Sequence, residues 1–411
     1  APGEIDELET PLAGVTVFQP SGALLTFSNG VACDTCTSLE SPSITKTVTD
    51  SSGSFTLTGV APGPNTRIVV QSGRWRRQIT LNVPACQTTN PAAGTFRMPR
   101  NRTEGDIPKM ALVLGDQETL ECMFRKMGIA ASEIGPRTGT SDQKRIQLWQ
   151  TNGMTTSPAA PNVTGLVNNS SVLNEYNALI WDCDGGPAIS GSYSQNSTAT
   201  HRNNLQNYTN IGGRMFMDHF PGDLIRYGPA PNNSVATWTS AAQSGIPTYL
   251  TGPKRGKVLQ SNPVNQLLYD WLRNTAGAMT DYGNPYVRVD QPRNHAVTPD
   301  PTKTVEWIRG HTSDGWGGSP NGNVSYSFSF ETPLNQPHCG VPGGHGRVIY
   351  NGMHVSGTRH TGGGYPGGKP FPANCNLSLG LTPEEKALEY QLFQLTACQL
   401  GGEPPPPPPE P

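Results

Sequence analysis

The segment KMALVLGDQETLECMFRKMG, residues 109–128, contains the two patterns that decide the fold class. It opens with an almost continuous apolar run, which is typical of a strand buried on both faces of a sheet. Apolar residues then recur with the i, i+3, i+4, i+7 spacing of an amphipathic helix, at Leu120, Met123, Phe124 and Met127. A buried strand that leads directly into a helix indicates an α/β sheet.

The same alternation continues towards the C-terminus. Further strands are predicted at 176–183, 212–219, 325–330 and 346–352, and helices at 201–208 and 263–274. A last helix is predicted to begin at Thr382, where TPEE supplies an N-cap, a proline in the first turn and the capping residue Glu385. Its buried side is predicted to carry Leu388, Leu392 and Leu395. We therefore expect an open α/β sheet with helices on both faces.

The first part of the chain has a different pattern. Residues 14–19, 43–48 and 54–60 are rich in β-branched and aromatic residues and alternate apolar with polar side chains, as half-buried strands do. Residues 67–71 and 78–83 flank SGRWRR and are predicted to form a hairpin. These short strands predict an all-β sandwich.

The chain is therefore predicted to contain two domains. The β-sandwich is expected at 11–98 after a short extension at 1–10, and the α/β domain is expected at 99–400. The tail GGEPPPPPPEP at 401–411 is predicted to be a polyproline II spacer, because its composition cannot form a packed core. If something holds that tail, a neighbouring copy of the chain is one candidate.

Two regions resemble known families. AGVTV (13–17) and TVTDSSGSFTLTGVAPG (47–63) are similar to the carboxypeptidase-regulatory-like, transthyretin-type domain, which implies a non-catalytic spacer or binding module on an exported protein. The CDTC sequence at 33–36 is not part of that pattern.

The second region resembles the class I glutamine-amidotransferase-like superfold, in particular its trehalose-utilisation-type branch. YNALIWDCDGG (176–186), GGRMFMDH (212–219) and GRVIYNGMH (346–354) carry the likeness. It implies a flavodoxin-like open sheet, with a loop-rich insertion at about 275–320 that the likeness does not explain. The whole arrangement also resembles uncharacterised bacterial exported proteins.

Composition narrows the functional classes. The 411 residues include 47 glycines and 39 prolines, and only 15% are charged, against roughly 25% in an average soluble protein. The net charge of -2 and the lack of a basic run longer than RWRR argue against nucleic-acid binding. No apolar run approaches the roughly 18 residues of a membrane span. A secreted or cell-surface protein is expected.

Eight cysteines agree with export. An even number in a chain of this composition predicts structural disulfides in an oxidising compartment. They stand at Cys33, Cys36, Cys86, Cys122, Cys183, Cys339, Cys375 and Cys398. Three lie in the first region and five in the second, so complete pairing requires a bridge between the regions. A zinc or redox site at the lone CxxC of 33–36 is the weaker alternative.

Cys183 raises the question of nucleophilic catalysis. Its neighbours Asp182 and Asp184 disfavour a thiolate because both are acidic. The amidotransferase resemblance implies a cysteine in a turn after the next strand, but that turn reads MDHF, 217–220. We therefore expect Cys183 to form a disulfide, for example with Cys122.

Asp218 and His219 are the best catalytic candidates, because they end a strand where open α/β sheets bind ligands. His354 ends the neighbouring strand and Asp116 follows the first one, so the four residues would form a metal or acid-base cluster. The alternative is that these polar residues lie at the edge of the sheet without a catalytic or metal-binding role. No cofactor is predicted.

These observations favour a binding, adhesive or self-assembling structural protein. Its expected partners are other copies of the chain or surface glycans. Trp307, Trp316 and Tyr365 would form a glycan-binding surface if exposed, although such aromatics more often pack beneath loops. The rival hypothesis is a hydrolase-like enzyme with its active site around Asp218 and His219.

Overall fold

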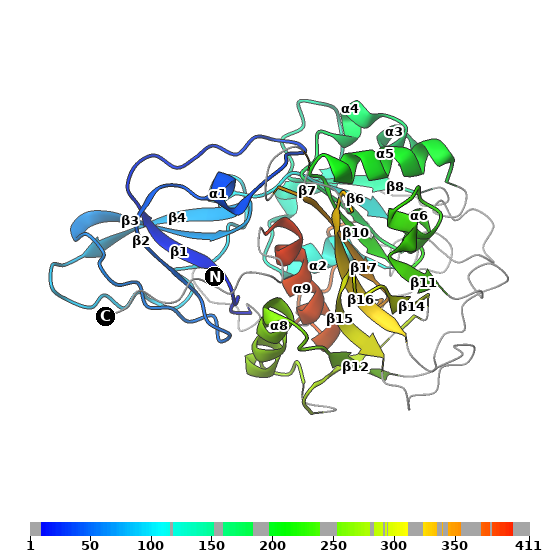
Figure 1. Ribbon diagram of the computed structural model, residues 1–411. Coiled ribbons are helices and arrows are strands. Elements are labelled where there is room, and N and C mark those ends of the chain that lie inside the picture. The colour runs from blue at the N-terminus through cyan, green and yellow to red at the C-terminus, as the bar shows by residue number, and fades with distance from the viewer. Residues whose placement is uncertain are drawn as a thin grey trace.

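The structure is a computed structural model of the chain. It describes residues 10–115, 118–151, 159–183, 197–238, 253–279, 283–290, 292–293, 295–310, 324–334, 339, 344–354, 371–378 and 380–397. Two sheets dominate these residues, a smaller one in the N-terminal region and a larger one in the rest of the chain (Figure 1). None of the described helices combines the length and hydropathy that a membrane span needs.

The larger sheet has ten strands among the described residues, in the order β13-β12-β15-β16-β17-β10-β9-β6-β8-β7. Its strands that pair in parallel are β6 (Met110–Leu114), β7 (Ile134–Pro136), β8 (Ile146–Gln150), β9 (Ala178–Trp181), β10 (Arg214–Asp218) and β17 (Gly346–Asn351). The run β8-β6-β9-β10-β17 corresponds to the 2-1-3-4-5 order of flavodoxin-like sheets. In such sheets the crevice between the first and third strands is where ligands bind, here between β6 and β9.

The predicted insertion extends this sheet. The antiparallel strands beyond β17 are β16 (Ser325–Thr332), β15 (Val305–Gly310), β12 (Lys254–Val258) and β13 (Tyr286–Val289). β13 and β15 lie within the range expected to be loop-rich, as does β14 (Ala296–Pro299), which pairs with β11 (Ala236–Trp238) in a separate two-stranded sheet. The insertion therefore contributes three strands, β13, β14 and β15, among its described residues.

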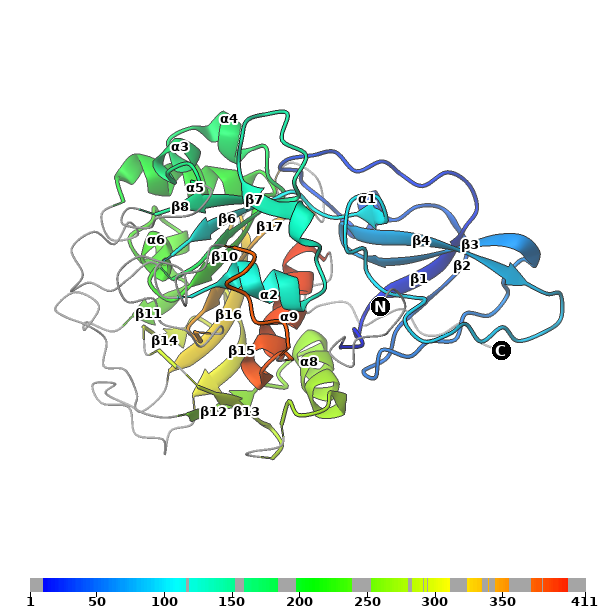
Figure 2. The same cartoon turned by 180° about the vertical axis from the view of Figure 1, so that it is seen from behind.

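Helices cover both faces of the large sheet, as predicted (Figures 1 and 2). One face carries α2 (Leu120–Lys126), α8 (Pro263–Asn274) and α9 (Pro383–Thr396), and the other carries α3 (Thr164–Val167), α4 (Ser170–Leu173), α5 (Ala199–Asn210) and α6 (Gly222–Arg226). Strand β6 shows why both faces need cover, because Leu112 and Leu114 enter one core and Ala111 and Val113 the other. Side chains of a strand alternate between faces, so a wholly apolar strand must be buried twice.

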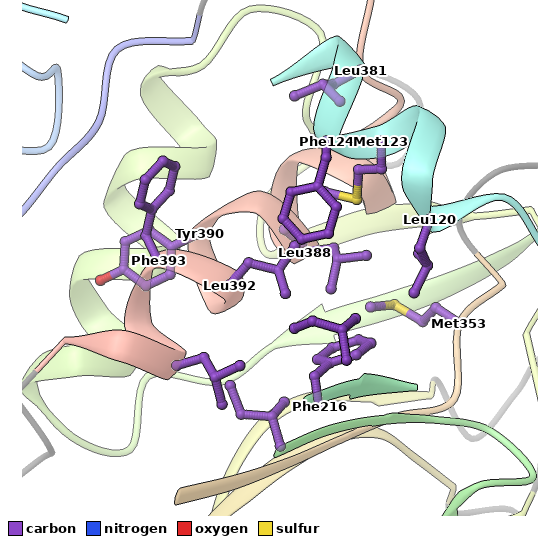
Figure 3. Packing of buried hydrophobic residues seen from close by; sticks show 14 of the residues in the cluster. Leu120, Met123, Phe124, Phe216, Met353, Leu381, Leu388, Tyr390, Leu392 and Phe393 are labelled. Carbon is purple, nitrogen blue, oxygen red and sulfur yellow. The ribbon is translucent and has the colours of Figure 1, made fainter. Parts of the chain in front are cut away.

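Helix α9 forms as the sequence predicts and is buried on nearly all sides. Thr382 Oγ1 accepts from Glu385 N, and Glu385 Oε2 accepts from Thr382 N, which together form a capping box. The predicted Leu388, Leu392 and Leu395 are buried. Figure 3 shows Leu388 and Leu392 with Phe124 of α2, above Phe216 of β10. The opposite side of α9 meets the N-terminal sheet, where Trp75 and Phe393 pack with ring centroids 5.3 Å apart.

The N-terminal region is one antiparallel sheet rather than the expected sandwich of two. Its order is β2 (Ser43–Val48), β1 (Thr16–Pro20), β3 (Gly63–Ser72), β4 (Trp75–Val83) and β5 (Gly105–Asp106). The predicted strand at 54–60 is irregular. Phe55, Leu57 and Val60 still pack on the core of this sheet, so their alternation reflects burial without strand pairing.

The CDTC sequence joins the two regions. Cys33 forms a disulfide with Cys339, which confirms the expected bridge between the regions. Next to it, the buried carboxylate of Asp34 accepts bonds from Arg74 Nε at 2.6 Å and Nη2 at 2.8 Å. Arg214, at the start of β10, approaches the same carboxylate at 3.3 Å. One acidic side chain thus ties the β3–β4 hairpin to the central strand of the large sheet.

The other cysteines divide into a second disulfide and two thiols. Cys122 of α2 is bonded to Cys375 in the segment before α9. Cys86 is an exposed thiol and Cys183 is a buried thiol, so the disulfides expected at these two positions are wrong. The side chain of Cys36 and the whole of Cys398 lie outside the described residues.

We predict that Asp34→Asn lowers the free energy of unfolding by about 3–5 kcal/mol, because it leaves two buried guanidinium groups without their counter-charge. Denaturant unfolding under non-reducing conditions measures this loss. Asp50→Asn is the control, since Asp50 is exposed and bonds only to nearby residues of its own turn. Equal small losses in the two variants would contradict the role given to Asp34.

Candidate functional site

Four adjacent parallel strands end at one edge of the large sheet, and each is followed by polar residues. Glu118 follows β6, Asp182 and Cys183 follow β9, Asp218 and His219 lie at the end of β10, and His354 follows β17. Strand register brings them together, because Met217 pairs with Trp181 on one side and Asp218 with Asn351 on the other. The predicted Asp218, His219 and His354 therefore meet, whereas Asp116 lies outside the described residues.

His219 occupies the tight turn between β10 and α6. Its φ of 49° lies in the left-handed region, which costs a residue other than glycine of order 1–3 kcal/mol. The turn is held by its backbone: His219 N donates to Asn351 O at 2.6 Å, and Gly222 N donates to His219 O at 2.9 Å. This is the turn at which the amidotransferase resemblance implies a cysteine, and it presents an imidazole instead.

Two other side chains converge on the Nδ1 atom of His219. Cys183 Sγ lies 3.3 Å from it, and His354 Nε2 lies at the same distance of 3.3 Å. All three residues are at most 2% exposed. The Cys183 backbone N–H donates to its neighbour Asp182 Oδ1 at 2.9 Å, which fixes the chain at this point. Cys183 is therefore part of the site rather than a cross-link.

Three buried carboxyl groups lie beside Cys183, His219 and His354. Burial, and then the nearby Asp218, raise the pKa of Glu118 well above its ordinary value. Burial also raises the pKa of Asp218, to about 6, while hydrogen bonds from Glu118 and from Asn351 Nδ2 at 2.7 Å oppose the rise. Burial and the proximity of Glu121 raise the pKa of Asp182 as well. Of this pair, Glu118 therefore has the higher pKa and keeps its proton more readily than Asp218 does.

His219 is uncharged in these surroundings. Its pKa lies well below the ordinary 6.5, first because of burial and then because of His354, Arg293 and His295. A neutral imidazole retains a lone pair, so it can accept a proton or bind a metal ion.

The insertion supplies two residues that sequence reasoning misses. Arg293 Nη2 lies 2.6 Å from His354 Nδ1, and His295 Nε2 lies 3.2 Å from Asp223 Oδ1. Backbone contacts place this segment, since Arg293 N donates to Gly352 O at 2.8 Å. No periodic pattern surrounds these residues in the sequence. Glu118 is also missed, although its position directly after a predicted strand is a usable signal.

The described residues do not support the expected glycan-binding surface. Trp307 is fully buried, and its Nε1 donates to Ser329 Oγ at 2.9 Å. Trp316, Tyr365 and the proline-rich tail lie outside the described residues.

Comparison with known proteins adds little. No protein-family model matches the chain, and no curated protein matches it. A solved structure described as a thua-like protein, from Bacteroides uniformis, matches 75% of this chain and 95% of its own, with 13% identity and a TM-score of 0.33. At this TM-score the likeness carries no argument about function.

We predict that Glu121→Gln stabilises the protein above pH 7 and changes little near pH 4.5. Burial raises the pKa of Glu121 to about 7 from its ordinary 4.5, against a hydrogen bond from Asn374 Nδ2. The folded chain therefore holds a proton that the unfolded chain has released, so wild-type stability falls as the pH rises from 4.5 to 7. The substitution removes a penalty of roughly 3 kcal/mol at high pH.

Denaturant unfolding at pH 4.5 and pH 8 measures this difference. Glu40→Gln, at an exposed position, is the control. A Glu121→Gln variant whose advantage is the same at both pH values would contradict the account.

Proposed function

We propose that this protein is an exported enzyme of hydrolytic type whose active site is the carboxyl edge of β6, β9, β10 and β17. The two disulfides among the described residues are consistent with an exported protein. The observation that carries the catalytic part is the convergence of the buried Glu118, Asp218 and His354, whose ligand atoms lie within 4.8 Å of one another, beside the neutral imidazole of His219. The proposal favours the enzymatic hypothesis over a purely adhesive or structural role.

The cost of burial supports this choice. Carboxyl groups and imidazoles removed from water destabilise a fold unless they are fully hydrogen-bonded or paired. Here Asp182 and Asp218 are fully buried, and Glu118, His219 and His354 nearly so, at one edge of the sheet. A purely structural protein would gain stability by replacing them with apolar residues. Enzymes retain such clusters because catalysis needs shifted pKa values.

The arrangement assigns complementary roles to the two carboxyl groups. Asp218 is the ionised member, held by Asn351, and is suited to accept a proton from an attacking water molecule. Glu118 is the protonated member and is suited to donate a proton to a leaving group. Arg293 lies close enough to His354 to place a fixed positive charge at the site. Such a charge stabilises negative charge that develops during hydrolysis.

We predict that Glu118→Gln and Asp218→Asn each reduce hydrolysis at least 100-fold, because each removes one proton-transfer group. Chromogenic nitrophenyl esters, phosphates and glycosides are the substrates for the assay. Glu133→Gln is the matched control, since it makes the same change at a buried glutamate directly before β7, at the amino edge of the sheet opposite the site.

Circular dichroism and thermal unfolding show whether each variant is folded. The proposal fails if the wild-type chain hydrolyses none of the three substrate classes. It also fails if a folded Asp218→Asn variant keeps wild-type turnover.

A further inference from the structure

We infer that Cys183, His219 and His354 form a binding site for one divalent transition-metal ion of the zinc type. The inference deepens the proposed function, on which its catalytic meaning rests, because the same site would then hold a metal that activates water. Metal content can be measured without a known substrate, so the inference has a test of its own.

The distances between the three ligand atoms fit tetrahedral coordination. Zinc binds imidazole nitrogen at about 2.0–2.1 Å and thiolate sulfur at about 2.3 Å. Tetrahedral angles then separate two nitrogens by about 3.3–3.4 Å and a nitrogen and a sulfur by about 3.5–3.6 Å. His354 Nε2 and Cys183 Sγ each lie 3.3 Å from His219 Nδ1. All three atoms lie within 4.8 Å of one another.

Hydrogen bonding at His219 Nδ1 alone does not account for this convergence. An imidazole nitrogen has one in-plane position, so it either donates one proton or accepts one. His219 Nδ1 meets both the Cys183 thiol and the His354 ring at hydrogen-bond distance. It can therefore satisfy only one of them, whereas a cation between the three atoms binds them all.

The surrounding carboxylates favour a cation at this point. Glu118, Asp218 and His354 form a second convergent group whose ligand atoms also lie within 4.8 Å of one another. The buried Asp182 Oδ2 and Asp218 Oδ2 receive no hydrogen bond from an amide, guanidinium, imidazole or alcohol group of the described residues. A metal ion bound between the three ligand atoms would supply a positive partner for these oxygens.

Metal binding would change one contact of His354. When Nε2 binds the ion, Nδ1 carries the proton of the neutral ring and must donate it. Arg293 Nη2, now 2.6 Å from Nδ1, cannot be its acceptor, whereas Glu118 Oε1 lies 3.5 Å away. We therefore expect the ion to exchange Arg293 for Glu118 at Nδ1, giving the carboxylate-histidine-metal arrangement common in zinc sites.

The test uses the full chain under non-reducing conditions, stripped with a chelator and dialysed against Zn²⁺ or Co²⁺. We expect about one ion per chain by mass spectrometry of the metal, and a thiolate-to-metal charge-transfer band in the near-ultraviolet spectrum of the Co²⁺ form. Cys183→Ser should abolish that band, and His354→Asn should weaken Zn²⁺ binding at least tenfold in competition with a chromogenic chelator.

Two substitutions serve as matched controls. Cys86→Ser changes the other thiol, and His201→Asn changes a histidine on α5 that caps its own helix. Both should bind metal as the wild-type chain does. The inference is overturned if the wild-type chain binds no stoichiometric metal, if its Co²⁺ form lacks the thiolate band, or if Cys86→Ser loses metal as Cys183→Ser does.

The Co²⁺ band of the wild-type chain identifies a thiolate ligand even if a variant fails to fold. Hydrolysis by a chain that binds no stoichiometric metal after dialysis would overturn the metal site and leave the proposed function standing. Stoichiometric metal binding without hydrolysis of any substrate class would leave the metal site standing and overturn the proposed function.

Discussion

The parallel pairing of β10 with β9 and β17 is the constraint on which the rest of the site depends. Each strand delivers its polar residues at its carboxyl end, and the register places Asp218 opposite Asn351. Side chains alternate along a strand, so a slip of one residue would turn Asp218 to the other face of the sheet. The positions of His219 and His354 follow from the same pairing, since each comes just after the end of its strand.

The amino ends of the same two strands are anchored by charge. Arg214 and Arg347 are register partners at the starts of β10 and β17, and both are buried. Arg214 meets Asp34 from the N-terminal region, whereas Arg347 donates to the Gln394 carbonyl near the end of α9. The N-terminal region therefore contributes to the alignment of strands whose opposite ends carry the site, although it supplies none of the site residues described above.

The sequence predicts the strands of the site well and their side-chain contacts poorly. Apolar runs reveal β6, β9 and β10, and the order of strands identifies the turn at His219. Cys183 is misread as a cross-link because its acidic neighbours are visible in the sequence and its contact with His219 is not. Arg293 reaches the site from an insertion, and only the folded chain shows that approach. In the N-terminal region, the alternation of Phe55 and Leu57 correctly predicts that these side chains are partly buried. It wrongly predicts that their segment pairs as a strand.

The disulfide between Cys33 and Cys339 has a consequence for how the chain would respond to proteolysis. It closes a loop of 306 residues that contains the connection between β5 and β6. A protease that cuts this connection would leave both fragments covalently attached, so electrophoresis without reductant would show an apparently intact chain. Only after reduction would the fragments run apart. Without reductant, such a cut would thus go undetected while the two sheets stay joined.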